Sequence, residues 1–192
     1  KDVRLKSKHF AMFLIDDAVE HIGEFIPKDV LSVFLDILAS HGLDSSLELR
    51  QAAVFGIGIT ALALGEAFKP RLNQTIQMLW QAIEMKKSAD DFPKFFLTVR
   101  DNAVASLGKL LQAFGGSMTP EDLSQGLRYW LKQLPILHDH KEATQQHQFL
   151  LSLVTSEPPV LPLSDPEVLK KAIEVFSQIH QRKKLCKEEM NN

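Results

Sequence analysis

The chain has 192 residues, of which 45% are hydrophobic and 24% are charged, with 22 Lys and Arg, 24 Asp and Glu and one Cys. This composition is typical of a globular domain or repeat array, and it excludes collagen, a disulfide scaffold and a disordered tail. A net charge of −2 provides no general basic field, so we expect no nucleic-acid partner, and the single cysteine indicates a reducing compartment.

Apolar residues recur at helical spacing along the whole chain, without the sustained alternation of β-strands, so we predict an all-α protein. Four apolar stripes open near Pro27, Pro70, Pro120 and Pro166, which are separated by 43, 50 and 46 residues. Proline is well tolerated at the first helical position, because its missing N–H has no helical partner there. The regular spacing therefore predicts a repeat whose first helix begins at each proline.

Second helices are predicted between the proline-led helices, at 47–65, 95–114 and 140–156, with a counterpart at 5–24. Three of the four carry the pattern A-V-x-x-[I/L]-G, beginning at Ala18, Ala53 and Ala103. Small residues on one helix face allow close packing against a neighbour, so each unit is expected to be a helical hairpin. The predicted division is a single solenoid, 1–192, with units 1–26 (partial), 27–67, 68–117, 118–160 and 161–192 (partial).

Local signals mark where these helices begin and how units are joined. Ser45 with Glu48 three residues later matches a capping box, and Thr119 and Asp165 precede Pro-Glu pairs that favour helix starts. Asp44 precedes Arg50 by six residues, a spacing at which an Asp in the turn and an Arg in the next helix can bridge adjacent repeats. We therefore assign an inter-repeat structural role to Asp44, Arg50 and Arg100.

The most apolar stretch, from Ala52 to Gly65, is shorter than the about 18–20 residues that span a bilayer. We interpret it as a buried helix and expect no membrane partner. The chain begins at Lys1 without a basic and apolar leader, so we expect no signal peptide and interpret the chain as a fragment of a longer protein.

Four segments carry a resemblance to a known family: FLIDDAVEH (13–21), LRQAAVFGIG (49–58), VRDNA (99–103) and WLKQLPILHD (130–139). With the hairpin length of 43–50 residues, they resemble HEAT repeats, and more closely the C-terminal region of importin-β (karyopherin-β) receptors of the importin four and importin five branch. The resemblance covers essentially the whole chain. It implies an armadillo-like HEAT α-solenoid of about three and a half helical hairpins.

The resemblance also implies a function, that of a non-enzymatic nuclear transport receptor that shuttles between cytoplasm and nucleus and uses no cofactor. Such a receptor binds cargo on its inner surface and Phe-Gly nucleoporins on its outer surface, and exchanges cargo for Ran-GTP. The main Ran contacts of the family lie in N-terminal and central repeats. Ran binding is therefore expected of the parent protein rather than of this chain.

In the HEAT arrangement the second helices line the concave face, and their polar residues become candidates for protein binding. Asp16, Asp17, Glu20 and Glu24 would offer carboxylates to basic cargo segments through charge-assisted hydrogen bonds. The alternative interpretation of these carboxylates is an ordinary solvated helix surface. Weaker candidates by the same logic are Gln51, Asp101, Lys109, Gln112, Glu142 and Gln145.

Two other functions stay open from the sequence. A static HEAT scaffold subunit of a multiprotein complex would share the fold and lack nucleotide-sensitive release. A helical metal-dependent phosphohydrolase could use His138, Asp139, His140 and His147, but a metal site needs converging ligands and the sequence contains no matching distal pattern, so we expect no metal.

Overall fold

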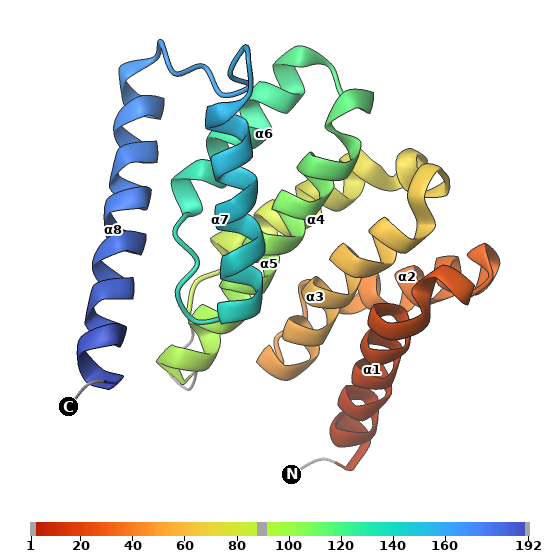
Figure 1. Cartoon of the computed structure of the whole chain (residues 1–192). Coiled ribbons are helices and arrows are strands. Elements are labelled where there is room, and N and C mark those ends of the chain that lie inside the picture. The colour runs from red at the N-terminus through yellow and green to blue at the C-terminus, as the bar shows by residue number, and fades with distance from the viewer. Residues whose placement is uncertain (1–2, 88–91, 191–192) are drawn as a thin grey trace.

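The computed structural model describes residues 3–87 and 92–190, and the chain over these residues is helical without any strand (Figure 1). The all-α prediction is confirmed. The α-helices are α1 (Val3–Ile22), α2 (Lys28–His41), α3 (Leu47–Leu64), α4 (Leu72–Glu84), α5 (Pro93–Phe114), α6 (Pro120–Gln133), α7 (His140–Thr155) and α8 (Pro166–Met190). Short 3-10 helices follow α1, α3 and α5, at Gly23–Phe25, Gly65–Arg71 and Gly115–Ser117.

The helices form two layers of a solenoid, with three hairpins flanked by α1 at one end and α8 at the other (Figure 1). We call α2, α4, α6 and α8 the first-helix layer, and α1, α3, α5 and α7 the second-helix layer. Within the second-helix layer, α3 packs against α1 and α5, and α5 packs against α7. The residue boundaries of the repeat units stay a prediction.

The helix starts agree with the sequence in several places and differ in three, one of which is Pro27: it is the N-cap of α2, which begins at Lys28. Thr119 caps α6 by accepting a hydrogen bond from the Asp122 N–H, and Pro120 is the first residue of α6, as predicted. The capping residue of α3 is Ser46 rather than Ser45: its hydroxyl accepts from the Leu49 N–H and contacts Glu48. Pro70 lies inside the 3-10 helix Gly65–Arg71 instead of opening α4, because the chain turns there without leaving helical geometry.

The core is centred on α3 and α5, whose small residues let the two helices approach each other closely. Gly58 of α3 faces Ser106 of α5, and the Ser106 hydroxyl donates a 2.6 Å hydrogen bond to the Val54 carbonyl. Residues 101–111 of α5 are all buried. The Phe68 and Phe114 rings, whose centroids lie 5.2 Å apart, close the same core at the far end of the helices.

By length and composition alone, one described segment, Leu47–Glu84, is apolar enough to cross a membrane, with a mean hydropathy of 1.5 in its most apolar window. Within the fold, however, 56% of that window is buried, and α3 packs against α1, α2 and α5. The apolar composition of α3 is thus accounted for by its place at the centre of the core.

Replacing Gly58 by alanine should destabilise the fold, because the new Cβ would lie 3.1 Å from the Ser106 backbone Cα and 2.9 Å from its Cβ. A backbone atom cannot move aside cheaply, so we expect the free energy of unfolding to fall by about 1–3 kcal/mol. Gly116→Ala is the matched control: nothing lies within 4 Å of its added Cβ, and its effect should stay within about 0.5 kcal/mol. Urea unfolding followed by circular dichroism measures both, and equal midpoints would contradict the close approach.

Candidate protein-binding surface on the second-helix layer

A buried ion pair joins α5 to α7. Lys109 Nζ donates to Glu142 Oε1 at 2.6 Å, and the two side chains are 7% and 2% exposed. The same Nζ lies 5.1 Å from the centre of the Phe55 ring of α3, which adds a cation–π contact. Because unpairing a buried charge is costly, this cluster fixes α3, α5 and α7 relative to one another.

Asp101 of α5 holds the loop that leads into α7. Its Oδ2 accepts hydrogen bonds from the backbone N–H groups of Leu137 at 2.9 Å and His138 at 2.7 Å, and lies 3.2 Å from His138 Nδ1. The Asp101 side chain is buried, so its carboxylate exchanges water for these donors. Asp101 therefore acts as an internal anchor between two repeats.

Asp16 is buried between α1 and α3 without comparable partners. It is 3% exposed, and its Oδ1 has no hydrogen-bond partner. Burial, and then the nearby charges of Asp17 and Glu20, raise the pKa of Asp16 from 3.8 to about 8. The carboxyl fits only because the facing residue of α3 is Gly56, where an added Cβ would collide with Asp16 Oδ1.

These positions correct part of the predicted binding surface. Asp16, Asp101, Lys109 and Glu142 are buried, so they cannot meet a partner from solvent as the sequence suggested. Asp16 shares its helix face with the buried Met12 and Val19, and Glu142 shares its face with the buried Gln146 and Phe149, so both point into the packed interior. Exposed or half-buried, and so available to a partner, are Asp17, Glu20, Glu24, Gln51, Gln112 and Gln145.

Three of the available residues form an acidic end of the second-helix layer, which we define as Asp17 and Glu20 of α1 and Glu24 of the following 3-10 helix. Asp17 and Glu20 are three residues apart and lie on neighbouring turns of α1, and Glu24 follows in the 3-10 helix directly after it. Lys141 of α7 reaches this face and forms an ion pair with Glu20, and the bond to Glu20 raises the pKa of Lys141. The sequence contained no signal for this contact between residues 121 positions apart.

The three residues assigned an inter-repeat role include one contact within a hairpin and one between hairpins. Arg50 Nε donates to the backbone carbonyl of Asp44 at 2.8 Å, within one hairpin. The Asp44 carboxylate accepts a hydrogen bond from the Ser46 N–H and contacts His41. Burial raises the pKa of Asp44, but the bonds to Ser46 and His41 outweigh burial, so the pKa is lowered. Arg100 of α5 does connect neighbouring hairpins, since it donates to Gln133 at the end of α6.

The residues of the phosphohydrolase alternative do not converge on a common point. Asp139 caps α7 by accepting from the Glu142 N–H at 3.0 Å, and His138 binds Asp101, whereas His140 is exposed. Across the described part of the chain, no group of three or more His, Cys, Asp or Glu is arranged to hold a metal ion.

The fold is a solenoid of stacked helical hairpins joined by buried polar contacts. The chain is also similar in sequence to known proteins. No protein-family model matches the chain. It is 28% identical over 130 residues to the "Probable importin-5 homolog" of Dictyostelium discoideum, covering 66% of this chain and 12% of that protein. It is 24% identical over 152 residues to the "Importin subunit beta-3" of Saccharomyces cerevisiae, covering 79% of this chain and 13% of that protein.

The chain is therefore related to the importin-β family, and its fold is that of a HEAT-repeat α-solenoid. It spans about an eighth of the length of the two curated relatives. The family resemblance read from the sequence is confirmed at this level.

Asp16 should make the stability of the fold decrease as pH rises. Between the ordinary pKa of 3.8 and about 8, the folded chain keeps a proton on Asp16 that the unfolded chain has lost. The unfolded state then binds fewer protons, so the free energy of unfolding falls with pH, by up to about 1.4 kcal/mol per pH unit for one proton.

Asp16→Asn, which carries no titrating proton, should remove this slope and be the more stable protein at pH 8. Urea unfolding at several pH values between 5 and 8 measures the slope. Glu157→Gln, an exposed loop carboxylate, is the control and should leave the slope unchanged. Parallel pH profiles of the wild type and Asp16→Asn would show that Asp16 is ionised in the fold.

Proposed function

We propose that the chain is a protein-binding segment of a nuclear transport receptor, and that its acidic end on α1 receives basic segments of cargo. The single observation that carries this proposal is the acidic end itself, Asp17, Glu20 and Glu24, on a solenoid related to importins. Carboxylates on neighbouring turns suit a chain of lysine or arginine side chains, because charge-assisted hydrogen bonds are stronger than neutral ones.

The contact between Lys141 and Glu20 supports the same chemistry. A lysine of the chain itself already occupies one carboxylate of the acidic end, which illustrates the kind of group that the surface accepts. Lys141 is mostly exposed, at 61%, so a basic segment from outside can displace it at little cost. In this proposal Lys141 competes with the incoming basic segment for Glu20.

The remaining functions of the proposed receptor concern the longer protein. Phe-Gly nucleoporin binding, Ran-dependent release and shuttling between cytoplasm and nucleus are proposed for that protein by its relation to importins. Ran binding by this segment is not part of the proposal. A static HEAT scaffold is the second candidate, and the buried polar contacts that fix α3, α5 and α7 favour it over a freely bending array.

The acidic end can be tested with a fluorescent lysine- and arginine-rich peptide and the purified chain. We expect Asp17→Asn combined with Glu24→Gln to weaken binding by about tenfold, since each lost charge contact is worth about 0.5–1 kcal/mol or more at a shared site. Lys141→Gln should act in the opposite direction and strengthen binding, because it frees Glu20. Fluorescence polarisation at two salt concentrations measures these affinities.

Glu121→Gln combined with Glu157→Gln is the matched control, because it changes the net charge equally at exposed positions away from α1. It should leave the affinity nearly unchanged. If both double variants weaken binding equally, the attraction is due to net charge and the acidic end is not the binding surface.

Ran dependence distinguishes a transport receptor from a scaffold and is measured on the full-length natural protein. Cargo bound to the immobilised protein should be released by Ran-GTP and retained with Ran-GDP. Retention in both nucleotide states, with the same Ran active on a known receptor, would favour the scaffold.

A further inference from the structure

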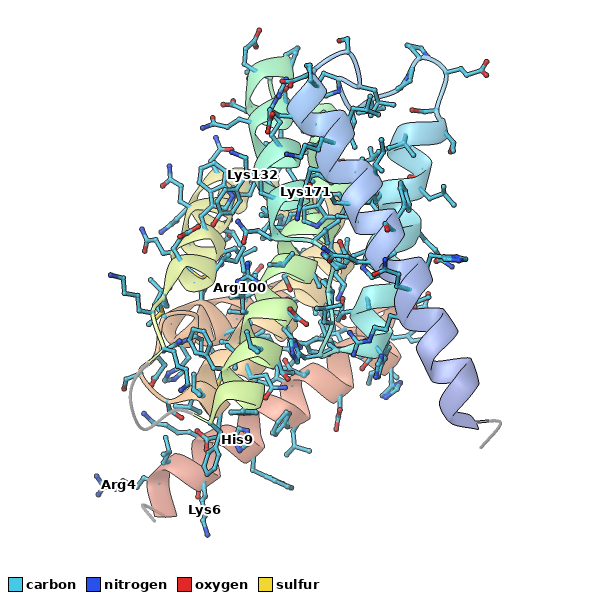
Figure 2. All side chains as sticks on the ribbon, turned by 90° about the vertical axis from the view of Figure 1, so that its left-hand side faces the viewer. Arg4, Lys6, His9, Arg100, Lys132 and Lys171 are labelled. Atoms are coloured by element: carbon cyan, nitrogen blue, oxygen red, sulfur yellow. The ribbon has the colours of Figure 1, made fainter. Side chains whose placement is uncertain are left out.

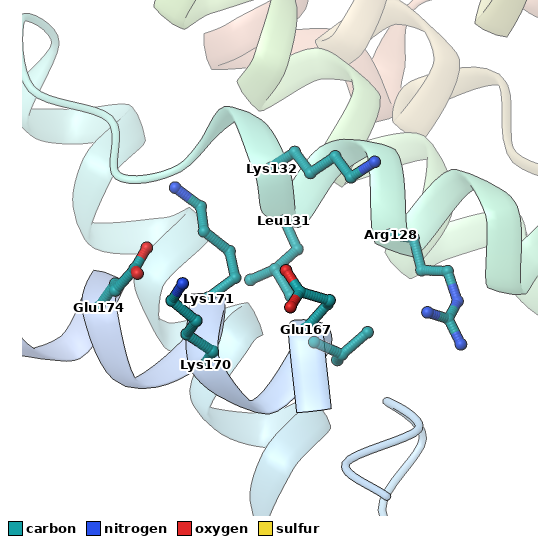
Figure 3. Close-up of a pocket in the computed structure, with 8 residues that line it drawn as sticks. Arg128, Leu131, Lys132, Glu167, Lys170, Lys171 and Glu174 are labelled. Atoms are coloured by element: carbon teal, nitrogen blue, oxygen red, sulfur yellow. The ribbon is translucent and has the colours of Figure 1, made fainter. Parts of the chain in front are cut away.

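A groove of about 290 Å³ lies between α6 and α8, in the first-helix layer and away from the acidic end (Figure 3). Its apolar lining comes from Leu131 of α6 and Val168 of α8, which are both buried. The floor of the groove is thus fixed by side chains that also hold the two helices together.

Both walls of the groove carry cations. Arg128 and Lys132 come from α6, and Lys170 and Lys171 come from α8 (Figure 3). Arg128 forms an ion pair with Asp165, which lowers the pKa of that carboxyl. For the three lysines, no ion pair with any described residue is found, and Lys132 and Lys170 are exposed while Lys171 is half-buried.

Two carboxylates also line the groove, Glu167 and Glu174. Glu167 precedes Lys171 by four residues and Lys170 precedes Glu174 by four, a spacing that permits ion pairs along a helix. No such pair is formed among these residues, so the lysine side chains stay available, and with Asp165 counted as the partner of Arg128 the groove has four cations against three carboxylates. Positive charge is concentrated here in a chain whose net charge is −2.

We propose that the α6–α8 groove binds an acidic segment of a partner protein. Carboxylates of that segment would pair with Lys132 on one wall and with Lys170 and Lys171 on the other. An aliphatic side chain of the same segment would cover Leu131 and Val168. The groove is separate from the acidic end and carries lysines instead of carboxylates, so its partner is of the opposite charge.

The mixed charge of the groove favours a peptide over a nucleic acid. A peptide can place spaced carboxylates beside the lysines and amide groups beside Glu167 and Glu174, whereas a polyphosphate chain carries negative charge at every step and is repelled by both. The groove lining also lacks an aromatic ring on which a base could stack, among all eight of its residues.

The test uses a fluorescent peptide in which glutamates alternate with leucine and serine, titrated with the purified chain. Lys132→Glu combined with Lys171→Glu should weaken binding by at least about tenfold. Lys86→Glu combined with Lys87→Glu is the matched control: the same charge change at exposed residues just after α4, outside the groove. Figure 2 shows Lys132 and Lys171 near each other in the upper half of the view, and Arg4 and Lys6 at its lower end.

We expect the groove variant alone to lose the acidic peptide while still binding the basic peptide used for the acidic end. Equal losses in the two lysine variants, or no binding of the acidic peptide by the wild type, would overturn the proposal. Tighter binding of a single-stranded oligonucleotide of equal charge, lost in the groove variant, would show a polyanion site instead. Should the double Glu variant unfold by circular dichroism, Lys132→Gln combined with Lys171→Gln replaces it and keeps the same expected order.

Discussion

The close approach of α3 and α5 at Gly58 and Ser106 is the constraint on which the other contacts depend. A hydrogen bond from the Ser106 hydroxyl to the Val54 carbonyl, 2.6 Å long, joins the two helices where a larger side chain could not fit. This contact sets the spacing of the second-helix layer. With α3 and α5 fixed, α1 packs on the far side of α3 and α7 packs on the far side of α5. The helix spacing in the whole layer therefore depends on the close contact at Gly58.

The same close packing explains why the polar residues of α5 have become structural. Since α5 lies between α3 and α7 and is also covered by the α6–α7 loop, Asp101 and Lys109 cannot reach solvent and must be paired inside. Asp101 binds two backbone N–H groups, and Lys109 binds Glu142. Polar contacts of this kind are directional, so they fix the register between hairpins in a way that apolar packing alone does not.

Helix positions and the repeat could be predicted from the sequence, because each depends on residues close together in the chain. Thr119 and Pro120 mark the start of α6, and the recurring Ala-Val pattern marks α1, α3 and α5. Burial of Asp101 and the contact between Glu20 and Lys141 could not be predicted, because they depend on how far neighbouring helices overlap. Helical periodicity indicates which face of a helix is polar, and only the stacking of units decides whether that face meets water.

Opposite charges are separated along the solenoid although the chain as a whole is nearly neutral. The acidic end lies on α1 in the second-helix layer, and the lysines of the α6–α8 groove lie in the first-helix layer at the other end. Partners of opposite charge would therefore approach different ends and would not compete for the same atoms. Binding at one end can affect binding at the other only through the contacts of α3, α5 and α7. The buried Lys109–Glu142 ion pair holds these helices in place, so the two ends should bind independently rather than with strong coupling.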